Sequence, residues 1–384
     1  MLTPLSSNKF RWVIAIAVAG TAILAFGQSA DDARMNQVQV LGSHNSYHVG
    51  IDPELFTFLR QKYGERMDGL YYSHLPIEQQ LDRGLRSLEI DVVYDPHGGL
   101  YAHPAGLEIE KQNHLPSREY DPQGLMNKPG LKVIHVPDID FRSNVYTFQQ
   151  ELTLLKMWSN AHPHHLPIAI TMNAKDDGLK EPGFVQPLLF DAVAFDGWDS
   201  EILKGLGREK LIVPDDVRGQ YAMLEAAVLA HAWPKLSQAR GKFFFILDET
   251  GQKMETYISG HPSLKGRVMF ANASEGRPEA AFRIVNEPKK DWAYIQYLVR
   301  SGYYVRTRAD ADTKEARTRD YTRWRAALIS GAQVISTDYY VPDARLGTGY
   351  SVKLPGGQPG RWNTLLLPGE RPLPSLESGL ESGR

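Results

Sequence analysis

Two acidic residues lie two positions apart within an apolar run. Glu89 and Asp91 alternate with apolar residues in the segment SLEIDVV. Because side chains i and i+2 of a strand point to the same face, both carboxylates aim at one place. Neighbouring carboxylates repel each other unless a cation lies between them or one of them is protonated. The spacing therefore favours a site for a hard cation, Ca²⁺ or Mg²⁺, although two solvated acids on an exposed edge strand would show the same spacing.

Histidines follow other apolar runs of the chain. His44 and Asn45 follow the first run, in LGSHNSYH, and His135 follows LKVI. A histidine with a pKa near neutrality exchanges a proton at physiological pH, so His44 is a candidate general base and His135 a candidate general acid. His103, in GLYAHP, is the second candidate for the acid, and the more strand-like run before His135 favours that residue. Asn45 adds an amide oxygen that could bind a cation.

Two arginines alternate at the end of a further apolar run. Arg306 and Arg308, in YYVRTRAD, lie on one side of the predicted strand. Two guanidinium groups on one side suit a phosphate. Salt bridges to Asp248 or Asp338 are the alternative use of these arginines. The histidine-rich segment AHPHHLP is more typical of a turn and a helix end than of a metal site.

Eight short apolar or β-branched runs predict the strands that position these residues. They are 38–42, 88–93, 131–136, 168–172, 243–247, 268–271, 303–306 and 334–336. Their continuous apolar character indicates parallel strands covered on both faces. Helical patterns separate them, so we expect a single α/β chain folded as a (β/α)₈ TIM-type barrel, with extra helices between the fourth and fifth strands. Reactive side chains of such barrels gather at the carboxyl ends of the strands.

The composition excludes several classes of protein. The 384 residues contain no cysteine, so disulfides and thiolate metal sites are excluded, and any metal must be held by oxygen or imidazole. The formal net charge is −2, which provides no basic field for nucleic acid. We expect a monomer whose contact with a membrane surface is transient, because no basic amphipathic helix is evident.

Both ends of the chain differ in composition from its middle. Lys9 and Arg11 precede an apolar run, Val13–Phe26, and small residues follow it. This pattern predicts a signal peptide over residues 1–30 and a secreted or periplasmic protein. A retained membrane anchor is the alternative, but the run is shorter than the roughly 20 residues that span a bilayer. We place the barrel at residues 31–353 and a Pro/Gly-rich tail at 354–384, with little regular structure after about Pro368.

The segments carrying these residues, taken together, resemble the Ca²⁺-dependent phosphoinositide-specific phospholipase C family of bacteria and fungi. The resemblance extends from Leu41 to about Tyr340. Its stretches are LGSHNSYH, LEIDVVYDP, GLKVIHVPDIDFRSNVYTF, HLPIAITMNAKDD, GYYVRTRADADTKEAR and ALISGAQVISTDYY. More distantly, the chain is similar to the glycerophosphodiester phosphodiesterases, which have the same barrel.

The resemblance implies a role for each matching position. It makes His44 the general base, puts His135 in the place of the general acid, and makes Asn45, Glu89 and Asp91 metal ligands. Eukaryotic phospholipases C carry a glutamate ligand on the fourth strand, where this chain has Asn173. The neutral oxygen of an asparagine would bind Ca²⁺ more weakly, which puts the affinity and the identity of the metal in doubt.

The resemblance also implies an activity. The expected reaction cleaves phosphatidylinositol-type phospholipids to a cyclic inositol phosphate and a diacylglycerol. Lys175 or Arg306 would neutralise the charge of the phosphate. Glycerophosphodiesterase or sphingomyelinase-D-like activity on the same barrel stays open, as does a catalytically silent barrel that binds a lipid head group.

Overall fold

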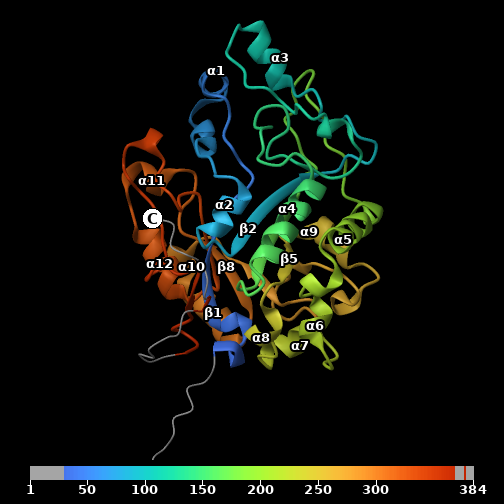
Figure 1. The fold of residues 1–384 in the computed structure, drawn as a ribbon, viewed down its shortest axis with the longest axis vertical. Coiled ribbons are helices and arrows are strands. Elements are labelled where there is room, and N and C mark those ends of the chain that lie inside the picture. Colours follow the sequence, from blue (N-terminus) through green and yellow to red (C-terminus); the bar gives the residue numbers. More distant parts are fainter. Residues whose placement is uncertain (1–29, 368–375, 378–384) are drawn as a thin grey trace, which may run out of the picture.

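Parallel pairing joins eight short strands into a nearly closed barrel (Figure 1), in a computed structural model that describes residues 30–367 and 376–377. The strands are β1 (Val38–Ser43), β2 (Ser87–Val93), β4 (Ile168–Ala174), β5 (Phe243–Leu247), β6 (Phe270–Ala271), β7 (Phe282–Ile284), β8 (Tyr304–Arg308) and β9 (Val334–Thr337). Their order is β6-β5-β4-β2-β1-β9-β8-β7, and an isolated parallel bridge between Ala271 and Ala280 brings the two end strands together. The predicted (β/α)₈ class is therefore confirmed.

Several barrel strands are buried on both faces. All five residues of β5, FFFIL, are buried, and so are all seven of β2. Strands β1 and β2 meet at one residue pair, Gly42 with Ser87. A Cβ atom at position 42 would lie 2.6 Å from the Cβ of Ser87, so only glycine permits this approach. The polar residues that follow β1 are thereby held beside those of β2.

Helices cover the outside of the barrel and extend it at one end. They are α1 (Pro53–Tyr63), α2 (Ile77–Asp82), α3 (Ala105–Gln112), α4 (Phe148–Ala161), α5 (Ala192–Leu206), α6 (Pro214–Arg218), α7 (Leu224–Leu229), α8 (Leu236–Ala239), α9 (Gly251–Ile258), α10 (Pro288–Ser301), α11 (Lys314–Thr318) and α12 (Thr322–Ser330). Four of them, α5 to α8, lie between β4 and β5, where the sequence predicts extra helices. The side chain of Thr147 caps α4 by accepting a hydrogen bond from the backbone N–H of Gln150 at 3.2 Å.

One strand of the predicted set is wrong and another was missed. Residues 131–136 were expected to form the third barrel strand, but only β3 (Lys132–Val133) forms there, and it pairs antiparallel with the end of β2. In chain order, β4 is the third strand of the barrel. The unpredicted strand β7 brings the number of barrel strands to eight. The physical reason is length, since a strand of three residues carries no periodic signal, while a buried loop can be as apolar as a strand.

The segments between β1 and α2 and between β2 and α4 build an extension beyond the carboxyl ends of the strands. In Figure 1, α1 and α3 lie at the top of the molecule, β2 runs toward them, and α6 to α8 lie at the opposite end. The extension has its own apolar cluster, which includes Leu55, Met126 and Phe141. It therefore packs as a cap over the region where the polar strand ends gather.

The C-terminal segment is partly built into the fold. Within the Pro/Gly-rich segment 354–384, strand β10 (Gly360–Trp362) pairs antiparallel with β1. Farther on, the Glu377 carboxylate forms an ion pair with the buried Arg86 guanidinium, which donates a 2.9 Å hydrogen bond from Nε. The proposed signal peptide, apart from Ala30, and most of the chain after Pro368 lie outside the described residues. Within the described part, no helix is long and apolar enough to span a bilayer.

A buried acid on α4 predicts a pH dependence of stability. Glu151 is fully buried, neither carboxylate oxygen has a hydrogen-bond partner among the described residues, and burial raises its pKa to about 8. A carboxyl with a raised pKa contributes stability that is complete below its unfolded pKa of about 4.3 and is lost as the pH rises through 8. We expect Glu151→Gln to flatten the fall in melting temperature between pH 5 and 8 and to be more stable than wild type above pH 8.

The matched control for this test is Glu108→Gln, which neutralises an exposed glutamate on α3. Melting curves of the three proteins from pH 4.5 to 9 give the comparison. An unchanged pH slope in Glu151→Gln would show that this carboxyl is not the titrating group.

Candidate active site

A histidine paired with an aspartate lies at the carboxyl ends of two adjacent barrel strands. His44 follows β1, Asp338 follows β9, and His44 Nδ1 lies 2.9 Å from Asp338 Oδ1. With the proton on Nδ1 in this bond, Nε2 is the free acceptor, and it points toward Glu89 at 3.9 Å. Burial and the neighbouring Arg308 hold the pKa of His44 well below its usual value. The imidazole is thus unprotonated near neutral pH and able to accept a proton.

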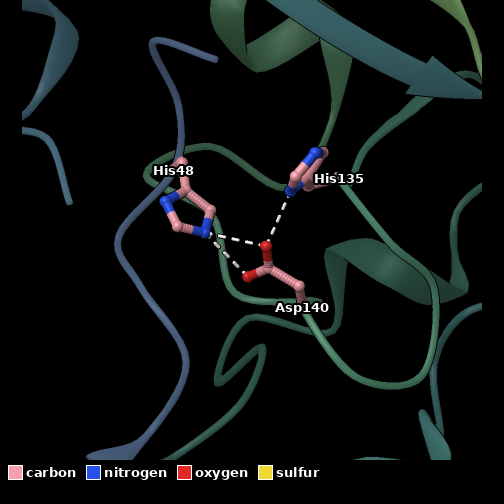
Figure 2. A group of neighbouring side chains, drawn as sticks. All are labelled: His48, His135 and Asp140. Atoms are coloured by element: carbon pink, nitrogen blue, oxygen red, sulfur yellow. Dashed lines mark hydrogen bonds and ion pairs between the residues drawn. The ribbon is translucent and has the colours of Figure 1, made fainter. Parts of the chain in front are cut away.

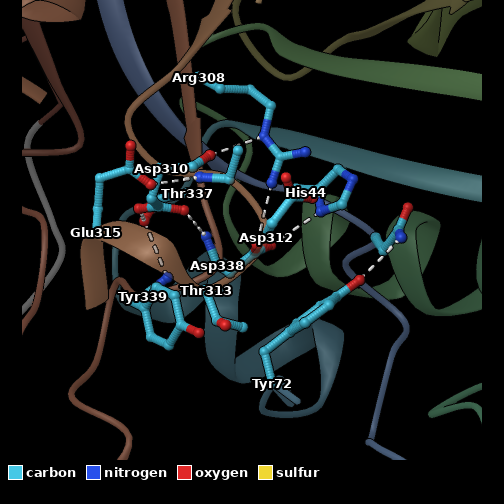
Figure 3. Close-up of polar contacts among 12 residues, drawn as sticks. His44, Tyr72, Arg308, Asp310, Asp312, Thr313, Glu315, Thr337, Asp338 and Tyr339 are labelled. Carbon is cyan, nitrogen blue, oxygen red and sulfur yellow. Dashed lines mark hydrogen bonds and ion pairs between the residues drawn. The ribbon is translucent and has the colours of Figure 1, made fainter. Parts of the chain in front are cut away.

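A layer of buried polar groups fixes the aspartate. The Asp338 carboxylate also accepts a 3.0 Å bond from Arg308 Nη2, and its backbone N–H donates to Asp310 Oδ1 at 2.8 Å. Thr337 donates to the other oxygen of Asp310 (Figure 3). Burial and the nearby Asp338 raise the pKa of Asp310 to about 7. Arg308 thus forms the salt bridge to Asp338 that the sequence analysis gave as the alternative to phosphate binding, and it also faces the site.

The residue after the histidine is held in an unusual backbone conformation. Asn45 has a φ of 45°, in the left-handed region that asparagine tolerates better than most residues. Its Nδ2 donates to the hydroxyl of Tyr72 at 2.9 Å, which turns the amide oxygen away from that ring. The next residue, Ser46, exchanges backbone and hydroxyl hydrogen bonds with Glu89, at 2.8 Å each. The loop after β1 is therefore fastened to β2.

One of the two paired acids forms an ion pair across the barrel. The Glu89 carboxylate on β2 meets the Arg306 guanidinium on β8, and strands β1 and β9 separate these two strands in the sheet. Both side chains must therefore point into the lumen. The other oxygen of Glu89 accepts a 3.3 Å bond from Asn173 Nδ2 on β4. Because β2 lies between β1 and β4 and Glu89 is buried, the alternative of a solvated edge strand is excluded.

Asp91, the second of the two acids, pairs with a lysine. Asp91 Oδ2 lies 3.1 Å from Lys175 Nζ, just after β4, and the nearby Asp91 raises the pKa of that lysine. Apart from this ion pair, the two oxygens of the buried carboxylate have no hydrogen-bond partner among the residues that the structure describes. Asp91 is therefore a desolvated acceptor with spare capacity, a condition that a further cation would relieve.

A second histidine–aspartate pair lies in the loops above the barrel. His135 follows the short β3 rather than a barrel strand, and its Nδ1 lies 2.7 Å from Asp140 Oδ2 (Figure 2). The same carboxylate accepts a hydrogen bond from His48 Nε2 at 2.8 Å. Although burial alone would lower it, the hydrogen bond and charge of Asp140 raise the pKa of His135. This imidazole is therefore set up to carry a proton.

The runner-up for the acid lies elsewhere. His103 is exposed in the turn before α3, on the extension. The structure brings together the other predicted residues around the carboxyl ends of β1, β2, β4 and β8, with His135 in the loop above them.

The sequence interpretation missed the part that four residues of this region play. His48 and Asp140 were given no role, although His48 stands inside the motif LGSHNSYH, and Asp248 and Asp338 were considered only as salt-bridge partners of the arginines. Asp248 follows β5, accepts a 3.1 Å bond from Asn272, and has a pKa raised by burial to about 7. An aspartate after an apolar strand was a usable signal for Asp248. The partnership of His48 with Asp140 joins loops 92 positions apart and has no local signal.

A family model described as "Phosphoinositide phospholipase C, Ca2+-dependent" matches residues 33–364. The chain belongs to this family. It is an enzyme of the phosphodiesterase class, as the sequence resemblance predicted. The sequence matches none of the curated proteins with which it was compared.

Solved structures of family members share the fold. A calcium-dependent phosphoinositol-specific phospholipase C from a Pseudomonas species is 15% identical, with a TM-score of 0.52 over 87% of this chain and 97% of that one. A Ca²⁺-dependent phosphatidylinositol-specific phospholipase C from Streptomyces antibioticus is 16% identical, with a TM-score of 0.50 over 82% of this chain and 97% of that one. At these identities the similarity establishes the fold alone.

The donor set around β2 fits a hard cation. Asp91 offers the two buried oxygens of a carboxylate that pairs with Lys175, and Asn45 uses its amide nitrogen to bond Tyr72, which leaves its amide oxygen as a possible ligand. Ca²⁺ prefers carboxylate and amide oxygens of this kind. Asn173 presents its nitrogen to Glu89, so it would need to rotate its amide to act as a ligand. Arg306 and Lys175 already supply positive charge to the two acids, which favours modest affinity for a cation.

The Asp338 contact generates a direct test. We expect Asp338→Asn to lower kcat on the order of 10²-fold on an aryl phosphodiester, because the charge that holds the His44 tautomer is removed. Asp343→Asn is the matched control, since Asp343 pairs with Arg345 on a neighbouring loop. Steady-state kinetics with melting temperatures separates catalysis from folding. A kcat for Asp338→Asn equal to that of the control would contradict the assignment.

Proposed function

We propose that this chain is an exported phospholipase C that cleaves phosphatidylinositol-type lipids to a cyclic inositol phosphate and a diacylglycerol. One observation carries the proposal beyond family membership. Two histidines, each held through Nδ1 by an aspartate, have pKa values shifted in opposite directions. Opposed shifts of this kind assign the base and the acid of a proton-transfer pair. His44 is the base and His135 the acid.

The chemistry follows from the two free Nε2 atoms. A head-group hydroxyl next to the phosphate attacks phosphorus while His44 Nε2 takes its proton. The bond from phosphorus to the glycerol oxygen breaks, and His135 Nε2 protonates that oxygen. The products are a five-membered cyclic phosphate and a neutral diacylglycerol. Each histidine ends with the protonation state in which the other began, so the later hydrolysis of the cyclic phosphate can restore both.

Three cationic side chains would stabilise the phosphate. Arg308 and Lys175 are partly exposed, at 12% and 30%, and each keeps one acidic partner. Arg306 lies deeper, with its Nε lacking a hydrogen-bond partner within the described residues. Donors held in place before the reaction stabilise charge that develops on the phosphoryl oxygens.

A Ca²⁺ ion, when bound, would lower the pKa of the attacking hydroxyl and offset charge on a phosphate oxygen. Asp91, Glu89 and Asn45 would hold it, with Asn173 as a further ligand and Mg²⁺ as the alternative ion. The solved Pseudomonas enzyme includes a myo-inositol complex, which supports a polyol head group for members of this fold. We also propose a monomer that is secreted or periplasmic and touches the membrane surface only transiently.

The substrate is tested with a panel. Purified protein is assayed on phosphatidylinositol, glycerophosphoinositol and sphingomyelin vesicles or solutions, with Ca²⁺ or with chelator. We expect turnover of phosphatidylinositol, with a cyclic phosphate product visible by ³¹P NMR. Preferential cleavage of glycerophosphoinositol or of sphingomyelin would replace the proposed substrate, and no turnover of any of them would favour a binding protein.

The acid is tested by varying the leaving group. We expect His135→Ala to lose on the order of 10²–10⁴ in kcat on lipid and much less on a p-nitrophenyl ester, because a good leaving group needs no proton. His44→Ala should be impaired on both. His103→Ala is the matched control on the extension. The assignment is wrong if His103→Ala shows the loss that depends on the leaving group and His135→Ala does not.

The cation is tested without activity. We expect Ca²⁺ to raise the melting temperature of the wild type and to have little effect on Asp91→Asn, since a ligand at a hundredfold excess over Kd stabilises by about 2.7 kcal/mol. Asp343→Asn, outside the site, serves as the control that keeps the shift. An equal shift in Asp91→Asn would place the ion somewhere else.

A further inference from the structure

Asp140 is clamped from two sides by imidazole rings. His48 Nε2 lies 2.8 Å from each carboxylate oxygen, and His135 Nδ1 lies 2.7 Å from Oδ2 (Figure 2). His48 and Asp140 are fully buried, whereas the His135 side chain is 15% exposed. Only one member of the cluster therefore reaches the space where a substrate could lie.

The hydrogen bonds to Asp140 show which ring nitrogens of the two histidines carry a proton. The carboxylate can only accept, so His48 donates from Nε2 and His135 from Nδ1. His48 Nδ1 is buried without a partner, which suits an unprotonated nitrogen and would leave an extra N–H unsatisfied. Although burial raises it, the two histidines hold the pKa of Asp140 well below its usual range. Asp140 thus stays ionised and presents a negative charge to His135.

The same three side chains could also be considered as a metal site. Their ligand atoms all lie within 4.8 Å of one another. Tetrahedral Zn²⁺ with bonds of about 2.0–2.1 Å separates its ligand atoms by roughly 3.3 Å. The observed contacts of 2.7–2.8 Å match charge-assisted hydrogen bonds instead. The distances therefore favour a hydrogen-bonded clamp over a metal site.

The clamp connects the loop of the proposed base to the loop of the proposed acid. His48 is four residues after His44, and its backbone N–H donates to Asn45 O at 2.9 Å. Its ring also packs against Tyr72, with centroids 4.3 Å apart, and Tyr72 holds the Asn45 amide. A displacement of His48 would therefore change the separation of the two catalytic imidazoles.

We propose that His48 and Asp140 are positioning residues that fix the tautomer of His135 and its distance from His44. This inference rests on the proposed function, because it assumes that His135 is the acid. Neither His48 nor Asp140 touches the substrate. They present the Nε2–H of His135 to the leaving oxygen and keep its ring from rotating.

The charged and titratable groups facing His135 come from several elements. They are Asp140 and His48 in the loops, Asp91 on β2, Lys175 after β4 and His44 after β1. Asp140 makes the direct contact, and Asp91 and Lys175 act with opposite signs. Removal of the Asp140 charge should therefore dominate any change in the titration of His135.

The direct test is ¹⁵N NMR of the imidazole rings in the full-length mature protein. In the wild type, neutral His135 should carry its proton on Nδ1 and not on Nε2. Asp140→Asn should lower the apparent pKa of His135 and mix its tautomers. A wild-type His135 with the proton on Nε2 overturns the proposal without any variant, so a folding defect cannot obscure the result.

Kinetics adds a graded comparison of His48 variants. His48→Gln keeps a donor near the Nε2 position, and His48→Phe keeps the ring without a donor. We expect His48→Phe to lose on the order of 10–100-fold in kcat on lipid, less than the loss of the acid itself, with KM little changed. His48→Gln should recover much of this loss. In His48→Phe, the alkaline limb of the pH–rate profile should shift, because the Asp140 carboxylate that holds His135 loses one of its two imidazole donors.

The outcomes distinguish this inference from the proposed function. If His135→Ala shows no dependence on the leaving group, the proposed function fails, whereas the NMR tautomer still reports on the clamp. If His48→Phe leaves the His135 resonances and the pH profile unchanged, the clamp fails and the proposed function stands. Stoichiometric, His48-dependent Zn²⁺ binding by calorimetry in the wild type would replace the clamp with a metal site.

Discussion

The ion pair between Glu89 and Arg306 is the constraint on which the site depends. It joins β2 to β8 through the lumen, where water is excluded and an unpaired charge would be costly. The pair is compatible only with a closed barrel, since the two strands are not neighbours in the sheet. Asn173 on β4 and His44 after β1 then face the free edge of the same carboxylate.

The acids at the carboxyl ends of the strands are already neutralised by protein groups, which distinguishes this region from a site that binds only a metal. Each proposed metal-binding acid has a basic partner, Arg306 or Lys175. Binding a cation together with an anionic phosphate would cost less free energy than binding either alone. The phosphate would attract the basic side chains, and the cation would take their place beside the acids. The arrangement thus favours coupled binding of ion and substrate over a permanently occupied metal site.

The two histidines show how surroundings can shift one residue type in opposite directions. Burial, followed by the charge of Arg308, lowers the pKa of His44, whereas the hydrogen bond and charge of Asp140 raise the pKa of His135 against the effect of burial. Both use Nδ1 to contact an aspartate, which leaves the same atom, Nε2, for chemistry. In the proposed mechanism, these opposite shifts separate the base from the acid.

The amino-acid sequence by itself determined the barrel class, the family, the common face of Glu89 and Asp91, and the grouping of polar residues at strand ends. These features depend on local periodicity and on motifs within a few residues. Only the tertiary structure decided that residues 131–136 stay out of the barrel and β7 completes it, that Arg306 pairs with Glu89, and that Asp140 joins His48 to His135. The Arg306–Glu89 and His48–Asp140 contacts join residues 217 and 92 positions apart. They follow from barrel closure and from loop packing, neither of which leaves a periodic signal.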